Sequence, residues 1–170
     1  MTKQELLTHE RLKEVLHYDP ETGLWIWREK TAPKSHIQVG DEAGDIQSNG
    51  YVRIQIDGLR YLAHRLAVFY MTGRWPEHQV DHWDLNKSNN RWSNLREATN
   101  GQNMANTSLR RDSSSSFKGV SRHSDDRKWW ARIQVRGRRI YLGCFDTRED
   151  AHAAYIAAAA EHFGEYARAA

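Results

Sequence analysis

The hydrophobic and polar positions of this 170-residue chain change their period several times, and each change predicts a new element. Apolar residues at helical spacing predict a helix over residues 4–17, and turn-forming residues at 19–23 end it. The apolar run at 24–27 predicts a short strand. Residues 30–44 have no clear period, so we expect a loop there.

Strict alternation then returns on both sides of the tight-turn pair Asp57-Gly58. Alternating residues at 51–56 and 59–62 therefore predict a β-hairpin. The segment 64–71 has helical spacing and stops before Gly73, which predicts a helix with a glycine at its end.

Two short apolar stretches separated by a long polar loop follow. Residues 79–82 and 95–98 predict strands, and a helix is expected over 100–108. Thr99 with Gln102 three residues later is the pattern of a capping box at the start of that helix. Strand, loop, strand and helix in this order predict a ββα unit.

The C-terminal part has a different organisation, in which three strands precede an alanine-rich helix. We expect strands at 119–123, 129–135 and 139–145 and a helix at 147–162. The fold class is therefore α+β: a ββα domain followed by a three-stranded antiparallel sheet packed on one α-helix.

At this length the chain has room for one ordinary domain or two small ones, so the sequence pattern must decide. The serine run at 113–116 indicates a hinge. We predict an N-terminal domain over 1–108 with its ββα core at about 79–108. A linker at 109–116 and a second domain over 117–170 follow.

Alternation also predicts which side chains of the C-terminal sheet face the helix. One face is apolar and consists of Trp129, Ala131, Ile133, Val135, Ile140, Leu142 and Cys144. The other face is basic and aromatic and consists of Trp130, Arg132, Gln134, Arg136, Arg139 and Tyr141.

Charge strengthens the case for a nucleic-acid partner of this second face. The formal net charge of the whole chain is only +3. Between residues 110 and 143, however, ten basic side chains stand against three acids, a local net charge of +7. A basic block with aromatic residues inside it is typical of a nucleic-acid surface, although a solvated charged face would look similar.

The single cysteine, Cys144, excludes an internal disulfide, and it also excludes a structural zinc site built on paired cysteines. The longest apolar runs are too short to span a bilayer, and the polar first residues do not form a signal peptide. We therefore expect a soluble, cytoplasmic protein with no membrane partner.

Four residues of the ββα unit carry the types needed to cleave a phosphodiester: Asp81, His82, Asn94 and Asn103. An imidazole with an ordinary pKa of about 6.5 can take a proton from water at neutral pH. One carboxylate and one amide oxygen suit a hard cation such as Mg²⁺, with Mn²⁺ as the alternative. Adjacent residues of a regular strand face opposite sides, so both Asp81 and His82 can serve only where the strand ends or twists.

Residues 51–107 resemble the HNH, or ββα-metal, nucleases in a His-Asn-Asn version of the motif. The resemblance implies that His82 is the general base and that Asn94 braces the loop. It implies that Asp81 and Asn103 bind the metal. The pair His64-Arg65 recurs in the phage and intron branch of this family, where we expect a structural or backbone-contacting role.

Residues 116–166 resemble the Apetala or ethylene-response-factor DNA-binding domain in their Gly-Val step, Leu-Gly-x-Phe segment and alanine-rich helix. That family lays its sheet in the major groove. Its DNA-contacting positions fall on Lys118, Ser121, His123, Arg132, Gln134, Arg139 and Tyr141, and the outward face adds Trp130 and Arg136. Ser121, His123 and Arg132 depart from the plant pattern, so the plant recognition sequence is not expected here.

Together these features predict a site-specific, metal-dependent endonuclease of the homing type, acting on double-stranded DNA. The resemblance implies a phage or mobile-intron origin. The sequence leaves open whether one strand or both are cut, and a monomer that nicks is our expectation. The alternative is a DNA-binding regulator whose HNH unit is inactive.

Overall fold

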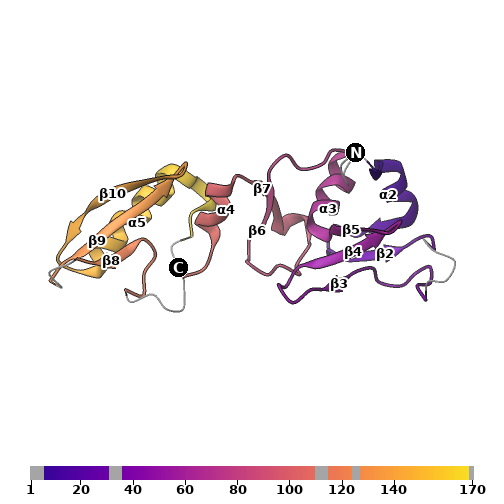
Figure 1. The fold of residues 1–170 in the computed structure, drawn as a ribbon, viewed down its shortest axis with the longest axis horizontal. Coiled ribbons are helices and arrows are strands. Elements are labelled where there is room, and N and C mark those ends of the chain that lie inside the picture. Colours follow the sequence, from indigo (N-terminus) through magenta and orange to yellow (C-terminus); the bar gives the residue numbers. More distant parts are fainter. Residues whose placement is uncertain (1–5, 31–35, 110–114, 124–126, 169–170) are drawn as a thin grey trace. The chain divides into compact units, whose positions relative to one another are not determined.

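The computed structural model describes residues 6–30, 36–109, 115–123 and 127–168 (Figure 1). The chain divides into two compact units, residues 1–97 and 98–170, and each has its own hydrophobic core. Small antiparallel sheets combine with helices in both, which confirms the α+β class. No helix within the described ranges is long and apolar enough to span a membrane.

The helix expected over residues 4–17 is confirmed only in part, because Leu16 and His17 belong to a strand and residues 4 and 5 lie outside the described residues. Helix α2 (His9–Val15) begins after Thr8, whose side chain accepts a hydrogen bond from the Arg11 amide. Strand β1 (Leu16–Tyr18) follows directly and pairs antiparallel with β2 (Trp25–Trp27). The apolar spacing at 15–18 fits a strand as well as a helix, and pairing with β2 decides between them.

The next three strands form one antiparallel sheet beside a helix. Strands β3 (Asp45–Ile46), β4 (Val52–Ile56) and β5 (Leu59–Leu62) lie in that order. The expected hairpin at Asp57-Gly58 is confirmed, and both residues have the positive φ that a type I′ turn needs. Helix α3 (Ala63–Thr72) then ends at Gly73, which has φ 72°.

The ββα order is also confirmed. Strand β6 (Gln79–His82) pairs with β7 (Leu95–Ala98), and a short 3₁₀ helix, η1 (Trp92–Asn94), leads into β7. Helix α4 (Asn100–Asn106) begins with the Thr99–Gln102 capping box that the sequence predicts.

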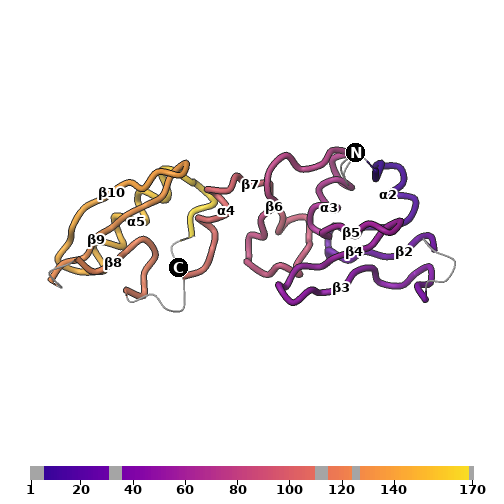
Figure 2. Tube along the Cα trace, viewed as in Figure 1, coloured from indigo at the N-terminus to yellow at the C-terminus, as the bar shows by residue number. Residues whose placement is uncertain are grey.

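The second compact unit is a three-stranded antiparallel sheet with a helix on one face (Figure 1). Its elements are β8 (Val120–Arg122), β9 (Trp129–Val135), β10 (Arg138–Phe145), α5 (Arg148–Phe163) and the 3₁₀ helix η2 (Gly164–Tyr166). The strand order is β10-β9-β8. Figure 2 traces the chain from β10 through α5 towards α4, and α4 contacts both α5 and η2.

A β-bulge in β10 changes which side chains face the helix. The register shifts between Tyr141 and Gly143, so that Cys144 pairs with Trp130. An extra residue in one strand reverses the alternation beyond it. Cys144 is therefore exposed instead of facing α5, and Phe145 packs into the core in its place.

The linker expected at 109–116 lies partly outside the described residues, since 110–114 are not among them. Ser115, near the end of the expected linker, is fully buried, and its hydroxyl donates to the carbonyl oxygens of Phe117 and Val120. The boundary between the compact units falls earlier, after Glu97. Helix α4 is therefore grouped with the second unit.

Candidate functional site

His82 is the last residue of β6 and is only 3% exposed. Its Nε2 atom lies 3.2 Å from Oδ1 of Asn90. The rings of His64 and Tyr51 lie 5.1 and 6.0 Å from the His82 ring, centroid to centroid. The hydrogen bond to Asn90 and the contacts with the two rings thus help to hold the imidazole at the end of the strand.

Burial is the largest influence on His82 and lowers its pKa below the ordinary value. The contact with Asn90 and the carboxylates of Asp84 and Asp81 act in the opposite direction but do not cancel this effect. A lowered pKa keeps the imidazole neutral at pH 7. A neutral imidazole is the form that can accept a proton from water.

His64 lies beside His82, and burial affects its pKa more strongly. It is 4% exposed, and its Nδ1 atom is buried without a hydrogen-bond partner among the described residues. Burial lowers the pKa of His64 to about 3. Its neighbour Arg65 donates to the carbonyl oxygens of Pro76 and His78, so Arg65 holds the segment before β6.

Asp81, the predicted metal ligand, forms a buried ion pair. Its Oδ2 atom lies 3.0 Å from both Nε and Nη2 of Arg96 on β7. The Arg96 guanidinium also lies over the Trp83 ring, 4.4 Å from its centroid. A cation that binds Asp81 would therefore share this carboxylate with Arg96.

Asn94 holds the two ends of the polar loop together. Its Oδ1 accepts from the Asp84 amide, and its Nδ2 donates to Asp84 Oδ1 and to the Asn89 carbonyl. Its own carbonyl accepts from the Trp83 amide. Burial alone would raise the pKa of Asp84, but hydrogen bonds from Asn89, Asn86 and Asn94 hold it below its ordinary value.

The β1–β2 hairpin supports the same loop from the other side. The Tyr18 hydroxyl donates to the Asn90 carbonyl at 2.6 Å, and the Trp92 amide donates to the Pro20 carbonyl at 2.9 Å. Gly23 has φ 76° and lies so close to the Asn90 backbone that a Cβ atom would collide with it. The polar loop is therefore fixed by contacts far apart in sequence.

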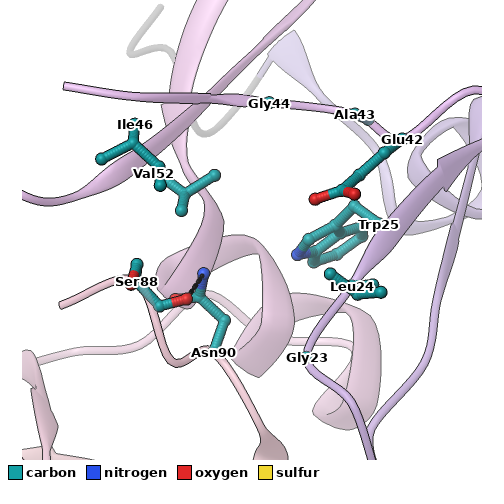
Figure 3. A pocket seen from close by; sticks show the side chains of 10 residues that line it. All are labelled: Gly23, Leu24, Trp25, Glu42, Ala43, Gly44, Ile46, Val52, Ser88 and Asn90. Atoms are coloured by element: carbon teal, nitrogen blue, oxygen red, sulfur yellow. Dashed lines mark hydrogen bonds between the residues drawn. The ribbon is translucent and has the colours of Figure 1, made fainter. Parts of the chain in front are cut away.

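A pocket opens beside Asn90 between this loop and β2 (Figure 3). Trp25, Glu42, Val52 and Ser88 are among its lining residues. The indole nitrogen of Trp25 points into the pocket and has no hydrogen-bond partner among the described residues. Asn90 donates through Nδ2 to the Ser88 carbonyl at 3.3 Å, the contact dashed in Figure 3.

The side chains predicted to bind a metal ion, those of Asp81 and Asn103, would do so through oxygen atoms. Within the described residues, no three His, Cys, Asp or Glu side chains gather closely enough to hold an ion. Carboxylate and amide oxygens, the atom types that Asp81 and Asn103 carry, suit Mg²⁺, which keeps several waters and takes few protein ligands. Asn103 lies on α4 in the second unit, and its role as a ligand remains a prediction.

The outward face of the C-terminal sheet gathers aromatic and basic side chains around Trp130. The Arg132 guanidinium lies 3.9 Å from the centroid of the Trp130 ring. His123 and Tyr141 meet the same ring edge to face, at 4.7 and 6.3 Å. The other predicted DNA-contacting side chains are exposed: Ser121, Gln134, Arg136 and Arg139.

Lys118 differs from the rest of that predicted set. Its Nζ donates to the carbonyl oxygens of Ala105 at 2.7 Å and of Arg168 at 3.1 Å. Burial lowers its pKa to about 8. Because its ammonium ties the end of α4 to the C-terminal segment, we leave Lys118 out of the proposed DNA-contacting surface.

Sequence reasoning missed Asn90 and Arg96. Asn90 stands in an asparagine-rich loop where nothing local distinguishes it from Asn89. Arg96 is one of several arginines near the motif, and only the pairing of β6 with β7 places it on Asp81. Their contacts with His82 and Asp81 are the signal that identifies them.

Two comparisons with known proteins bear on this geometry. A family model described as HNH endonuclease matches residues 61–105. The ethylene-responsive transcription factor WRI1 of Arabidopsis thaliana is 46% identical over 65 residues. That alignment takes in 34% of this chain and only 15% of the plant protein, so the chain corresponds to a small part of it.

The fold, the site and the family model agree on one class of domain. Strands β6 and β7 and all of helix α4 except its last residue fall within the matched residues, as do His82, Asn94 and Asn103. An HNH endonuclease domain is therefore present. In addition, a 65-residue segment of the chain is similar to part of a plant transcription factor.

Proposed function

We propose that this protein is a site-specific, metal-dependent DNA endonuclease of the homing type, encoded by a phage or mobile intron. We place its action in the cytoplasm of the host cell. One observation carries the proposal: a buried His82 stands at the end of β6, in contact with Asn90 and adjacent in sequence to Asp81. His82 lies within residues 61–105, which match the HNH endonuclease family model.

In this mechanism His82 takes a proton from a water molecule, and the water oxygen attacks the phosphorus atom of the scissile phosphodiester. The bond from phosphorus to the 3′ oxygen breaks, and the leaving oxygen is protonated by solvent. The products are a 5′-phosphate and a 3′-hydroxyl. A divalent cation held by Asp81 and Asn103, Mg²⁺ or Mn²⁺, would neutralise charge on the phosphate and the leaving oxygen.

In this proposal, the C-terminal sheet recognises the DNA target site. The exposed face around Trp130 and Arg132 would lie against double-stranded DNA, with Ser121, His123, Gln134, Arg136, Arg139 and Tyr141 beside them. Arginine can pair bidentately with guanine and glutamine with adenine. Because one HNH site cuts one strand per encounter, we propose that the monomer nicks.

Incubation with supercoiled plasmid carrying the target site tests the reaction. We expect relaxation with Mg²⁺ and none with EDTA, since the metal is required for charge neutralisation. His82→Ala should abolish cleavage while DNA binding, measured by fluorescence anisotropy, stays near the wild-type value. His78→Ala, which removes an exposed histidine four residues earlier, is the matched control. Strong metal-dependent cutting by His82→Ala would refute the assignment.

A DNA-binding regulator with an inactive HNH unit is the second candidate. The ion pair of Asp81 with Arg96 favours it, because the guanidinium occupies an oxygen that the metal would need. The supercoiled-plasmid assay described above distinguishes the two functions. Binding of the target site without any metal-dependent change in plasmid topology would establish the regulator.

A further inference from the structure

The contact between Asn90 and His82 assigns the hydrogen atoms of both side chains. The oxygen and nitrogen of an amide are distinguished by their partners. One end of the Asn90 amide faces the carbonyl oxygen of Ser88, which can only accept, so that end is the NH₂ group. The end that faces Nε2 of His82 is therefore the oxygen.

An amide oxygen only accepts hydrogen bonds, so Nε2 must donate to it. A neutral imidazole carries one N–H, and its other ring nitrogen then bears the lone pair. With the hydrogen on Nε2, the basic atom of His82 is Nδ1. This assignment follows from the partner of Nε2 alone.

Asn90 is itself held rigidly. It is 2% exposed, its carbonyl accepts from the buried Tyr18 hydroxyl, and Gly23 packs against its backbone. The rings of Tyr51 and His64 restrict the His82 ring on its other sides. An amide that is fixed in this way can hold both the orientation and the tautomer of its partner.

We propose that Asn90 is a positioning residue for cleavage: its amide oxygen keeps the hydrogen of His82 on Nε2, so that Nδ1 takes the proton from the attacking water. The proposal rests on the nuclease function proposed above. It adds two points to that function. Nδ1 is assigned as the basic atom of His82, and Asn90, which the N-terminal hairpin anchors, determines this assignment.

The tautomer is measured directly by two-bond ¹⁵N–¹H correlation NMR on the metal-free protein at slightly alkaline pH. The His82 signals are identified by their loss in His82→Gln. We expect a single Nε2–H tautomer in the wild type and a mixture of both tautomers in Asn90→Leu. Asn89→Leu is the matched control, because the neighbouring Asn89 side chain contacts Asp84 instead of His82.

Cleavage kinetics form the second arm. Asn90→Leu should lower kcat by roughly ten- to a hundredfold with little change in KM for DNA, since the residue acts through His82 and touches no substrate. Asn90→Asp keeps an acceptor opposite Nε2 and should recover most of the lost kcat. A purely structural role would not give this split or this recovery.

Several results would overturn the proposal. Finding the hydrogen of wild-type His82 on Nδ1 would overturn it alone, and this measurement does not depend on the folding of any variant. An unchanged single tautomer in folded Asn90→Leu, or equal kcat losses in the Asp and Leu variants, would also do so. A different outcome is that the wild type shows the expected tautomer but does not cleave DNA. This result would refute the nuclease function, and the role of Asn90 in cleavage with it.

Discussion

The buried side chain of His64, next to His82, makes the stability of the N-terminal unit depend on pH. Its pKa is about 3 in the folded protein, because burial disfavours the charged ring, against about 6.5 when unfolded. Between these values the unfolded chain binds a proton that the folded chain does not. The stabilising contribution is therefore complete above about pH 6.5 and is lost as pH falls towards 3.

We predict that the N-terminal unit loses roughly 1.5 kcal/mol through His64 alone between pH 6.5 and pH 5. In His64→Phe, which keeps an aromatic ring but cannot titrate, the free energy of unfolding should depend less steeply on pH. Urea denaturation at several pH values, followed by tryptophan fluorescence, measures the two slopes. Equal slopes would mean that burial does not lower the pKa of His64 in the folded state.

The residues of the site differ in how far sequence could predict them. Asp81, His82 and Asn94 are readable because their types and spacing are local to one loop and its flanking strands. Asn90 and Arg96 are not, since their importance lies in contacts that form only when β6 meets β7 and the loop closes. The β1–β2 hairpin, which supports Asn90 through Tyr18, lies 72 residues away in sequence.

At the scale of elements, Gly119 is the most constrained turn residue of the second unit. It has φ 67°, and a Cβ atom there would lie 2.6 Å from the Arg132 carbonyl oxygen and overlap the Tyr155 ring. The glycine therefore lets the chain leading into β8 pass between β9 and α5.

Gly119→Ala should destabilise the C-terminal unit by roughly 3 kcal/mol or more, through backbone strain and the clash together. Gly137→Ala is a matched control: it has φ 78° with no atom within 4 Å of the added Cβ. We expect it to cost only about 1 to 2 kcal/mol, the conformational penalty by itself. Thermal unfolding of both variants gives the difference, and similar losses would show that Tyr155 gives way easily.

Element prediction succeeded where periodicity was strong and failed where pairing overrides it. The helix α5, the Asp57-Gly58 hairpin and the Thr99 capping box follow from local chemistry. The split of the expected helix at 4–17 depends on β2, a partner that no local period reveals. The bulge before Gly143 likewise leaves no signal in an alternating sequence.

At the scale of the whole molecule, two compact units with separate cores predict separable functions. Arg132→Ala should weaken binding to the target site by about 1 to 3 kcal/mol if the side chain reads a base. Cleavage at saturating DNA should persist, because His82 lies in the other unit. Fluorescence anisotropy on target and scrambled duplexes measures the affinity and the preference.

Arg148→Ala controls for the loss of charge, because Arg148 lies at the start of α5 instead of on the outward sheet face. Its effect on affinity should be smaller than that of Arg132→Ala. If affinity and site preference both stay unchanged in Arg132→Ala, the outward face of β9 and β10 is not the reading surface.

Domain limits were the least predictable feature at this scale. The family match at 61–105 and the ββα order both group α4 with the strands before it. By its packing, α4 belongs with α5, and Lys118 binds its last turn. Sequence order and spatial packing thus give different boundaries for the same helix.

The bulge in β10 has a practical consequence for handling the protein. It turns the only thiol of the chain, Cys144, to the outside, opposite Trp130 on the neighbouring strand. Air oxidation can join two molecules through an exposed unpaired cysteine. Such a covalent pair would meet face to face at the Trp130 side and hide both surfaces from a duplex. Under the DNA-binding role proposed for this face, a sample stored without reductant should bind a duplex more weakly than a reduced sample, and added dithiothreitol should restore the binding.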